Sequence, residues 1–186
     1  MTNVKKLNAV SFLSGMLFYT PIMTLFLLEH GINLGFLIAA QTAFSIAMML
    51  GELPTGVLAD KYGQKVSIRL GLLLDAFGML QLLFVRGPIS LILFFLVRGV
   101  SVAFRSGSDE ALLYDSYKAE NKSTIGYSKA FGHFLANDVL GFIVGTALAG
   151  VGVALFGQSS YAPLIILSGL ATLMAIAVSY TLKTTK

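Results

Sequence analysis

The sequence predicts an all-α membrane protein with six transmembrane helices, and three observations support this fold class. The chain is 56% hydrophobic and 12% charged, with a mean hydropathy of +0.82, whereas about a quarter of the residues are charged in soluble domains. Its apolar residues fall into six runs, each near the ~20 residues that a helix needs to cross a ~30 Å hydrocarbon core. About six such helices fill the 186 residues, so we expect residues 1–186 to form a single transmembrane domain.

Polar and turn-forming residues separate the six apolar runs. The breaks carry Gly, Pro and Asn residues, which favour turns, and the fourth break is long enough for a separate amphipathic surface helix over residues 110–118. Lys5 and Lys6 precede the first run as in a signal peptide. That run is too long, however, and no small-residue cleavage pattern follows it, so we expect it to be retained. The expected spans are residues 7–28, 36–53, 67–85, 89–104, 127–155 and 161–182.

Basic residues fall almost entirely on one side of the predicted membrane. Short cytoplasmic loops accumulate Lys and Arg, and the opposite side holds Arg86 alone. We therefore expect a multi-pass protein of the cell (plasma) membrane with both termini in the cytoplasm. The net charge of +4 reflects this asymmetry and gives no reason to expect a nucleic-acid partner. The basic side holds Lys5, Lys6, Lys61, Lys65, Arg69, Lys118, Lys122, Lys129, Lys183 and Lys186.

Residues 56–65, which read GVLADKYGQK, place a charged turn between the second and third spans. This turn resembles the signature loop between helices 2 and 3 of the major facilitator superfamily, G-x-L-A-D-[RK]-x-G-[RK]-[RK]. Gln64 departs from the first paired basic position, whereas Tyr19 and Pro21 in the first span fit the amino-terminal half of that family. The positive-inside rule explains the lysines, but it does not explain the two glycines that flank the Asp-Lys pair. The matching residues are Gly56, Leu58, Ala59, Asp60, Lys61, Gly63 and Lys65.

This resemblance implies half of a major facilitator fold, built as a 3+3 inverted repeat. The family normally has two six-helix halves, so we expect either a homodimer or a second six-helix half as the partner. The loop is thought to act as a cytoplasmic latch, in which Asp60 would face a positive helix start in the other half. In a two-fold homodimer that start would lie near Tyr127 and Ser128 of the second copy. Lys61 would reach Asp109 within the chain.

A glycine-rich stretch in the fifth span supports two interpretations. It resembles the antiporter pattern G-x8-G-x3-G-P-x2-G-G, with threonine at the proline position and alanine at the first of the paired glycines, which implies a drug:proton antiporter. Alternatively, Gly141, Gly145 and Ala149 form a stripe of small residues that lets two membrane helices pack closely, whatever the protein does. The residues that resemble the pattern are Gly132, Gly141, Gly145, Ala149 and Gly150.

Three ionisable residues lie deep in the predicted spans. A charge in the bilayer costs at least ~2.5 kcal/mol, so each of them needs a partner or a function. Arg98 falls midway along the fourth span and Asp138 reaches a similar depth in the fifth, so we expect these two residues to form a buried ion pair. Asp75 in the third span has no partner that the sequence identifies.

Gln41, Ser45, Met48 and Glu52 form a largely polar stripe on the second span, because they recur at helical spacing. Such a stripe faces either a water-filled cavity or a partner helix. In a cavity, Glu52 would be a candidate proton carrier. Alternatively, Glu52 is hydrated near the cytoplasmic end of its span, or it pairs with Arg105 and fixes the packing.

The sequence carries no enzyme signature. It has no cysteine, its two histidines fall on opposite sides of the predicted membrane, and it lacks the phosphate-binding pattern G-x-x-x-x-G-K-[ST]. We therefore expect neither an enzyme nor an ATP-driven pump, and neither a cofactor nor a metal ion.

The sequence and the resemblance together predict a half-length secondary transporter that moves a small, lipophilic organic solute by alternating access, with proton-coupled efflux. Its partners would be the solute, protons and membrane lipid. The alternative is a non-transporting six-helix fragment or regulator that pairs with a full-length transporter, in which the latch would have no purpose. The expected proton or substrate pathway comprises Tyr19, Gln41, Glu52, Arg98 and Asp138.

Overall fold

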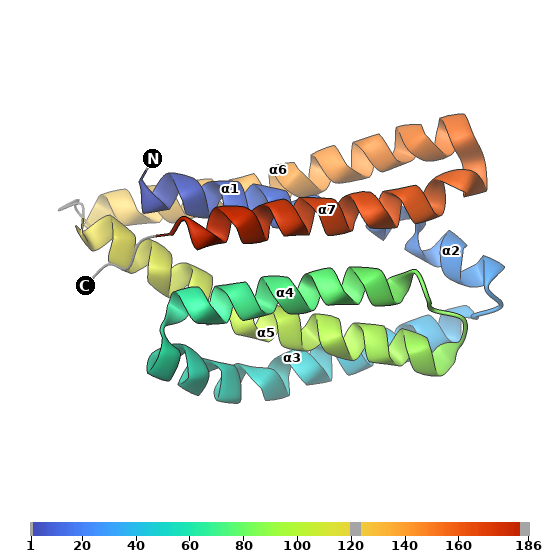
Figure 1. Ribbon diagram of the computed structural model, residues 1–186, viewed down its shortest axis with the longest axis horizontal. Coiled ribbons are helices and arrows are strands. Elements are labelled where there is room, and N and C mark those ends of the chain that lie inside the picture. Colours follow the sequence, from blue (N-terminus) through green and yellow to red (C-terminus); the bar gives the residue numbers. More distant parts are fainter. Residues whose placement is uncertain (1, 120–123, 183–186) are drawn as a thin grey trace.

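Helices are the only regular elements in residues 2–119 and 124–182, which are the residues that the computed structural model describes (Figure 1). The all-α class predicted from the sequence is confirmed. In chain order the elements are α1 (Asn3–Gly15), the 3₁₀ helix η1 (Thr20–Ile22), α2 (Met23–Glu29), α3 (Leu34–Tyr62), α4 (Gln64–Leu82), α5 (Pro88–Ala119), α6 (Thr124–Phe156), the 3₁₀ helix η2 (Gly157–Ser160) and α7 (Tyr161–Tyr180).

The helices form two groups (Figure 1). In the first group α1 packs on α6 and on α7, and in the second α5 packs on α3 and on α4, while α4 joins the groups by its contact with α7. The start of α1, the end of α7 and the turn at Gly63 lie at one end of the bundle, and α2 lies at the other. Among the basic residues expected on the cytoplasmic side, which corresponds to the end with the Gly63 turn, Lys122, Lys183 and Lys186 lie outside the described residues.

Four segments of the described chain are long and apolar enough to cross a membrane. The last of them contains two helices, α6 and α7, which run in opposite directions (Figure 1). Helix α4 is not among them, because its 19 residues include three charged ones, Lys65, Arg69 and Asp75. The four segments are Asn3–Glu29, Leu34–Tyr62, Pro88–Ala119 and Gly126–Tyr180.

The expectation of one continuous helix over residues 7–28 is wrong. Helix α1 ends at Gly15, residues 16–19 are not helical, and the chain resumes as η1 and α2. Pro21 lies in the first turn of η1, where its missing N–H removes no helical hydrogen bond. The break brings Tyr19, which is 7% exposed, into the apolar core.

The predicted turn at residues 56–65 is also shorter than expected. Helix α3 continues through Pro54 as far as Tyr62, so most of the charged stretch is helical. Gly63 has a φ of 91° and its N–H donates to the carbonyl oxygen of Ala59 at 2.8 Å. Because a left-handed conformation favours glycine, Gly63 ends the helix and makes the connection to α4 almost by itself.

The separate surface helix expected over residues 110–118 does not form, because α5 is one continuous helix of 32 residues. Its last turns are anchored by apolar packing. Leu112 and Leu113 are buried in a cluster that includes Leu7 of α1 and Phe134 of α6. The carboxyl end of α5 therefore belongs to the bundle and extends the wall that α5 presents to α1 and α6.

Candidate functional site

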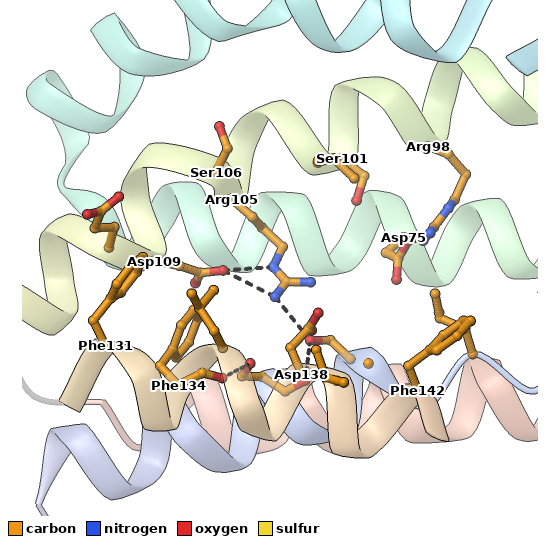
Figure 2. Close-up of a pocket in the computed structure, with 18 residues that line it drawn as sticks. Asp75, Arg98, Ser101, Arg105, Ser106, Asp109, Phe131, Phe134, Asp138 and Phe142 are labelled. Carbon is orange, nitrogen blue, oxygen red and sulfur yellow. Dashed lines mark hydrogen bonds and ion pairs between the residues drawn. The ribbon is translucent and has the colours of Figure 1, made fainter. Parts of the chain in front are cut away.

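A cavity of about 450 Å³ lies between α1, α5 and α6, with one lining residue from α4. Figure 2 shows that α5 contributes Arg98, Ser101, Arg105 and Asp109 to one wall, whereas Phe131, Phe134, Asp138 and Phe142 of α6 form the opposite wall. Successive members of each set are three or four residues apart, which places each set on one face of its helix. The cavity is therefore polar and charged on the α5 side and largely aromatic on the α6 side.

Arg105 joins α5 to α1 across the cavity. Its Nη2 donates to Oγ of Ser14 at 3.0 Å and lies 3.1 Å from Oδ2 of Asp109, and its Nε donates to the same Oδ2 at 3.2 Å (Figure 2). Both guanidinium contacts with Asp109 thus use one carboxylate oxygen. The other oxygen, Oδ1, is buried and has no hydrogen-bond partner among the described residues.

A second ion pair links Nη1 of Arg98 to Oδ1 of Asp75 on α4. Oγ1 of Thr172 on α7 donates to the other oxygen of Asp75 at 3.5 Å, and the guanidinium of Arg98 lies 5.9 Å from the ring centre of Tyr19. An arginine at this distance from an aromatic face is attracted by the ring. Contacts of this pair therefore link α4, α5, α7 and the non-helical segment after α1.

The expected ion pair between Arg98 and Asp138 is wrong, since Arg98 pairs with Asp75. Helix α5 packs along α4 but makes few contacts with α6, so the carboxylate on α4 is the nearer one. The sequence contained a signal for this pairing. Asp75 and Arg98 lie at similar distances from the short connection at residues 83–87, and two antiparallel helices joined by so short a connection are neighbours.

Asp138 lines the cavity without a direct partner. Among the described residues its carboxylate makes neither an ion pair nor a hydrogen bond, although it lies within electrostatic range of Arg105 and Asp109. Its backbone carbonyl lies against Gly15, and a side chain at Gly15 would collide with it. Asp138 is thus held in place by close backbone packing of α6 on α1.

A second cavity, of about 500 Å³, lies between α3 and α5 and is lined by Glu52, Asp60 and Glu110. The expected contact of Lys61 with Asp109 is not formed. The ammonium group of Lys61 lies 5.2 Å from the ring centre of Tyr62, and Asp109 faces the cavity on the α6 side of α5, where it binds Arg105.

The polar stripe of α3 is divided between two cavities. Gln41 lines a third cavity of about 270 Å³ together with Tyr19 and Arg98, whereas Glu52 lines the second cavity. The alternative pairing of Glu52 with Arg105 does not occur, because Arg105 binds Ser14 and Asp109 on the other side of α5. Arg98 lines both the first and the third cavity, so these two are neighbours.

The small residues of α6 lie against the end of α1. A Cβ at Gly141 would collide with the carbonyl oxygen of Phe12, and a Cβ at Gly145 would lie 3.1 Å from the backbone nitrogen of Leu17. In contrast, a Cβ at Gly132 or Gly150 would meet open space. The geometry therefore favours close packing as the role of Gly141 and Gly145, and Ala149 on the same stripe is fully buried.

Among the described residues, no group of three or more His, Cys, Asp or Glu side chains is arranged to hold a metal ion. The cavities instead offer ion pairs, hydroxyl groups and aromatic rings, which are groups able to bind and orient a small organic molecule.

A search among curated proteins found no match to the chain. A family model described as Major Facilitator Superfamily matches residues 7–186, which confirms the family that residues 56–65 indicated. With a helical bundle, apolar segments of membrane-spanning length and a polar cavity between its helices, the chain belongs to the Major Facilitator Superfamily, whose members are membrane transporters.

Proposed function

We propose that the chain is a six-helix half of a secondary transporter, and that the cavity between α1, α5 and α6 holds a small, lipophilic organic solute during alternating access. The charged lining of this cavity is the main observation in support of the proposal. Charged residues inside membrane-spanning helices are costly and mark substrate or ion pathways, and six charged residues from α4, α5 and α6 line this one cavity. They are Asp75, Arg98, Arg105, Asp109, Glu110 and Asp138.

We also propose that residues 1–186 form one domain of six spans arranged as a 3+3 inverted repeat. The pattern of helix contacts supports the repeat, because its most extensive contacts are preserved when α1, α3 and α4 are exchanged with α5, α6 and α7. Under this exchange the contact of α1 with α6 becomes that of α5 with α3, and the contact of α4 with α5 becomes that of α7 with α1. Such internal repeats are common in secondary transporters.

In this proposal both termini lie in the cytoplasm and the protein resides in the plasma membrane. The basic residues at the Gly63 end of the bundle support this orientation. Lys61 and Lys65 flank that turn, whereas Arg86 lies beyond the opposite end of α4.

The second half of the transporter would be either another copy of the chain or a separate six-helix protein. In a homodimer with parallel two-fold symmetry, Asp60 of one copy would approach the start of α6 near Tyr127 and Ser128 of the other, as a cytoplasmic latch. Asp60 and Ser128 are both exposed within a single copy, so both are available for such a contact.

The mass of the purified protein in lipid nanodiscs, corrected for lipid, tests this pairing. We expect two copies, with a disulfide crosslink between Asp60→Cys of one copy and Ser128→Cys of the other. Because the sequence has no cysteine, the crosslink would be unambiguous. A stable monomer without a crosslink would contradict the homodimer and would favour the alternative of a regulator that pairs with a full-length transporter.

We further propose that the solute leaves the cell in exchange for protons, with Glu52 and Asp138 as proton carriers. The glycine-rich stretch of α6 supports this assignment by its similarity to the antiporter pattern. In proteoliposomes with an imposed pH gradient, the wild-type protein should release protons when a lipophilic solute is added, and Glu52→Gln or Asp138→Asn should abolish this release. Solute transport that persists unchanged without a pH gradient would contradict proton coupling.

A further inference from the structure

The charged groups that line the cavity between α1, α5 and α6 do not balance. Two arginines face the cavity, and each is already paired with a carboxylate, Arg98 with Asp75 and Arg105 with Asp109. Two further acidic residues, Glu110 and Asp138, also line it. The cavity therefore carries excess negative charge, and because a carboxylate already neutralises each arginine, an anionic solute would add to that excess.

Asp138 is the acidic residue best placed to act on a solute. Glu110 is exposed and interacts with the hydroxyl of Tyr127, whereas Asp138 has no direct partner among the described residues. Its neighbours on the same face of α6 are aromatic. Phe134 lies one helical turn before it and Phe142 one turn after it (Figure 2).

A carboxylate between two phenyl rings is suited to a lipophilic cation. The faces of aromatic rings attract cations within about 6 Å, and the carboxylate supplies the opposite charge. The cavity of about 450 Å³ also lies within the range of ~300–1,000 Å³ that is typical of small-molecule sites.

Asp109 provides a second, independent observation. It lines the cavity, its residue is 6% exposed, and its Oδ1 accepts no hydrogen bond from any described residue. A buried polar atom without a partner is unfavourable by about 1–3 kcal/mol, so a donor on a bound solute, such as an ammonium N–H, would stabilise this site. The anionic group of a solute would supply no such donor.

We propose that the cavity binds a lipophilic organic cation, with Asp138 as its counter-ion and the phenyl rings of Phe134 and Phe142 on either side; this inference rests on the proposed transport function and names its substrate class. Arg105 and Asp109 set the cytoplasmic edge of this site. Arg98 and Asp75 set the opposite edge, next to the third cavity.

Two probes of the same shape and opposite charge test the inference, tetraphenylphosphonium and tetraphenylborate. Binding of each is measured to the full chain in lipid nanodiscs, with the binding to empty nanodiscs subtracted. We expect the phosphonium to bind at least about tenfold more tightly than the borate, which corresponds to about 1.4 kcal/mol. Asp138→Asn should remove this preference, and Asp138→Glu should keep most of it.

Asp115→Asn is the matched control, because Asp115 lies on α5 outside the cavity, and it should leave both affinities unchanged. Equal or tighter binding of the borate to the wild-type protein would overturn the inference, as would an Asp138→Asn variant with unchanged phosphonium affinity. If Asp138→Asn fails to fold, the relative affinity of the wild-type protein for the two probes still tests whether the cavity prefers a cation.

The result of the binding test is separable from a test of the proposed transport function, because equilibrium binding needs neither a gradient nor a transport cycle. Asp138-dependent cation binding without any transport in proteoliposomes would contradict the proposed function alone. Transport of a neutral or anionic solute that is indifferent to Asp138→Asn would contradict the inference alone.

Discussion

Arg98 and Arg105 lie two helical turns apart on one face of α5, and they are neutralised in different ways. Arg98 pairs with Asp75 on α4, whose other oxygen accepts a hydrogen bond from Thr172 on α7. Arg105 pairs with Asp109, one turn further along its own helix. An ion pair between helices fixes their packing, whereas a pair within one helix moves with that helix as a unit.

The two ends of the cavity should therefore differ in mobility. At the Arg98 end the side chains of three helices and Tyr19 are joined. At the Arg105 end, the stem of the arginine also lies against Gly71 of α4, but among the described residues its hydrogen bond with Ser14 of α1 is its one polar contact with another helix. We expect the Arg98 end to hold the bundle together and the Arg105 end to open when α5 and α1 move apart.

The largest effect is expected from Asp75→Asn. This change leaves the guanidinium of Arg98 inside the bundle without its counter-ion, and loss of one partner of a buried ion pair costs about 3–5 kcal/mol. The thermal unfolding temperature of the nanodisc-embedded protein should fall sharply, and the double variant with Arg98→Gln should recover part of the loss. An unfolding temperature equal to that of the wild type would show that this pair does not fix the packing.

A smaller effect on stability is expected from Asp109→Asn. The guanidinium of Arg105 keeps its bond to Ser14 and its access to the cavity, so the loss should be about 1.5–3 kcal/mol, as for a hydrogen bond to a charged group. The same unfolding measurement compares it with Asp75→Asn. If Asp109→Asn were the more damaging of the two, the assignment of a fixed end and a mobile end would be reversed.

Gly141→Ala tests whether close backbone packing holds α1 against α6. The new methyl group would collide with the carbonyl oxygen of Phe12, and overpacking of this kind costs about 1–3 kcal/mol. Gly150→Ala is the matched control because its Cβ meets open space, and alanine in a helix is favoured over glycine by up to ~1 kcal/mol. Equal unfolding temperatures for the two variants would argue against a tight contact at Gly141.

The family and the all-α class could be predicted because their signals are local. Hydropathy runs and the spacing of Gly56, Asp60 and Gly63 need no knowledge of which helices touch. Helix ends were less predictable, since the φ of 91° at Gly63 and the burial of Leu112 and Leu113, rather than local polarity, decide where α3 and α5 end.

The charge partners could not be read from depth in the membrane alone. Depth pointed to Asp138 as the partner of Arg98 and left Asp75 unassigned, whereas the packing of α4 along α5 brings Asp75 to Arg98. The Arg105–Asp109 pair was missed for another reason. Its spacing of four residues is a recognised helical pair, but it crosses the boundary that was expected between a membrane span and a surface helix.

The accessibility of a single cysteine at Val139 tests most directly whether the cavity is a transport site. Val139 is next to Asp138 and lines the cavity, whereas the neighbouring Leu140 does not line it and serves as the control. Val139→Cys should react with a membrane-impermeant thiol reagent in both right-side-out and inside-out vesicles, and bound tetraphenylphosphonium should slow both reactions. Reaction from one side only, at the rate of Leu140→Cys and indifferent to the probe, would contradict alternating access through this cavity.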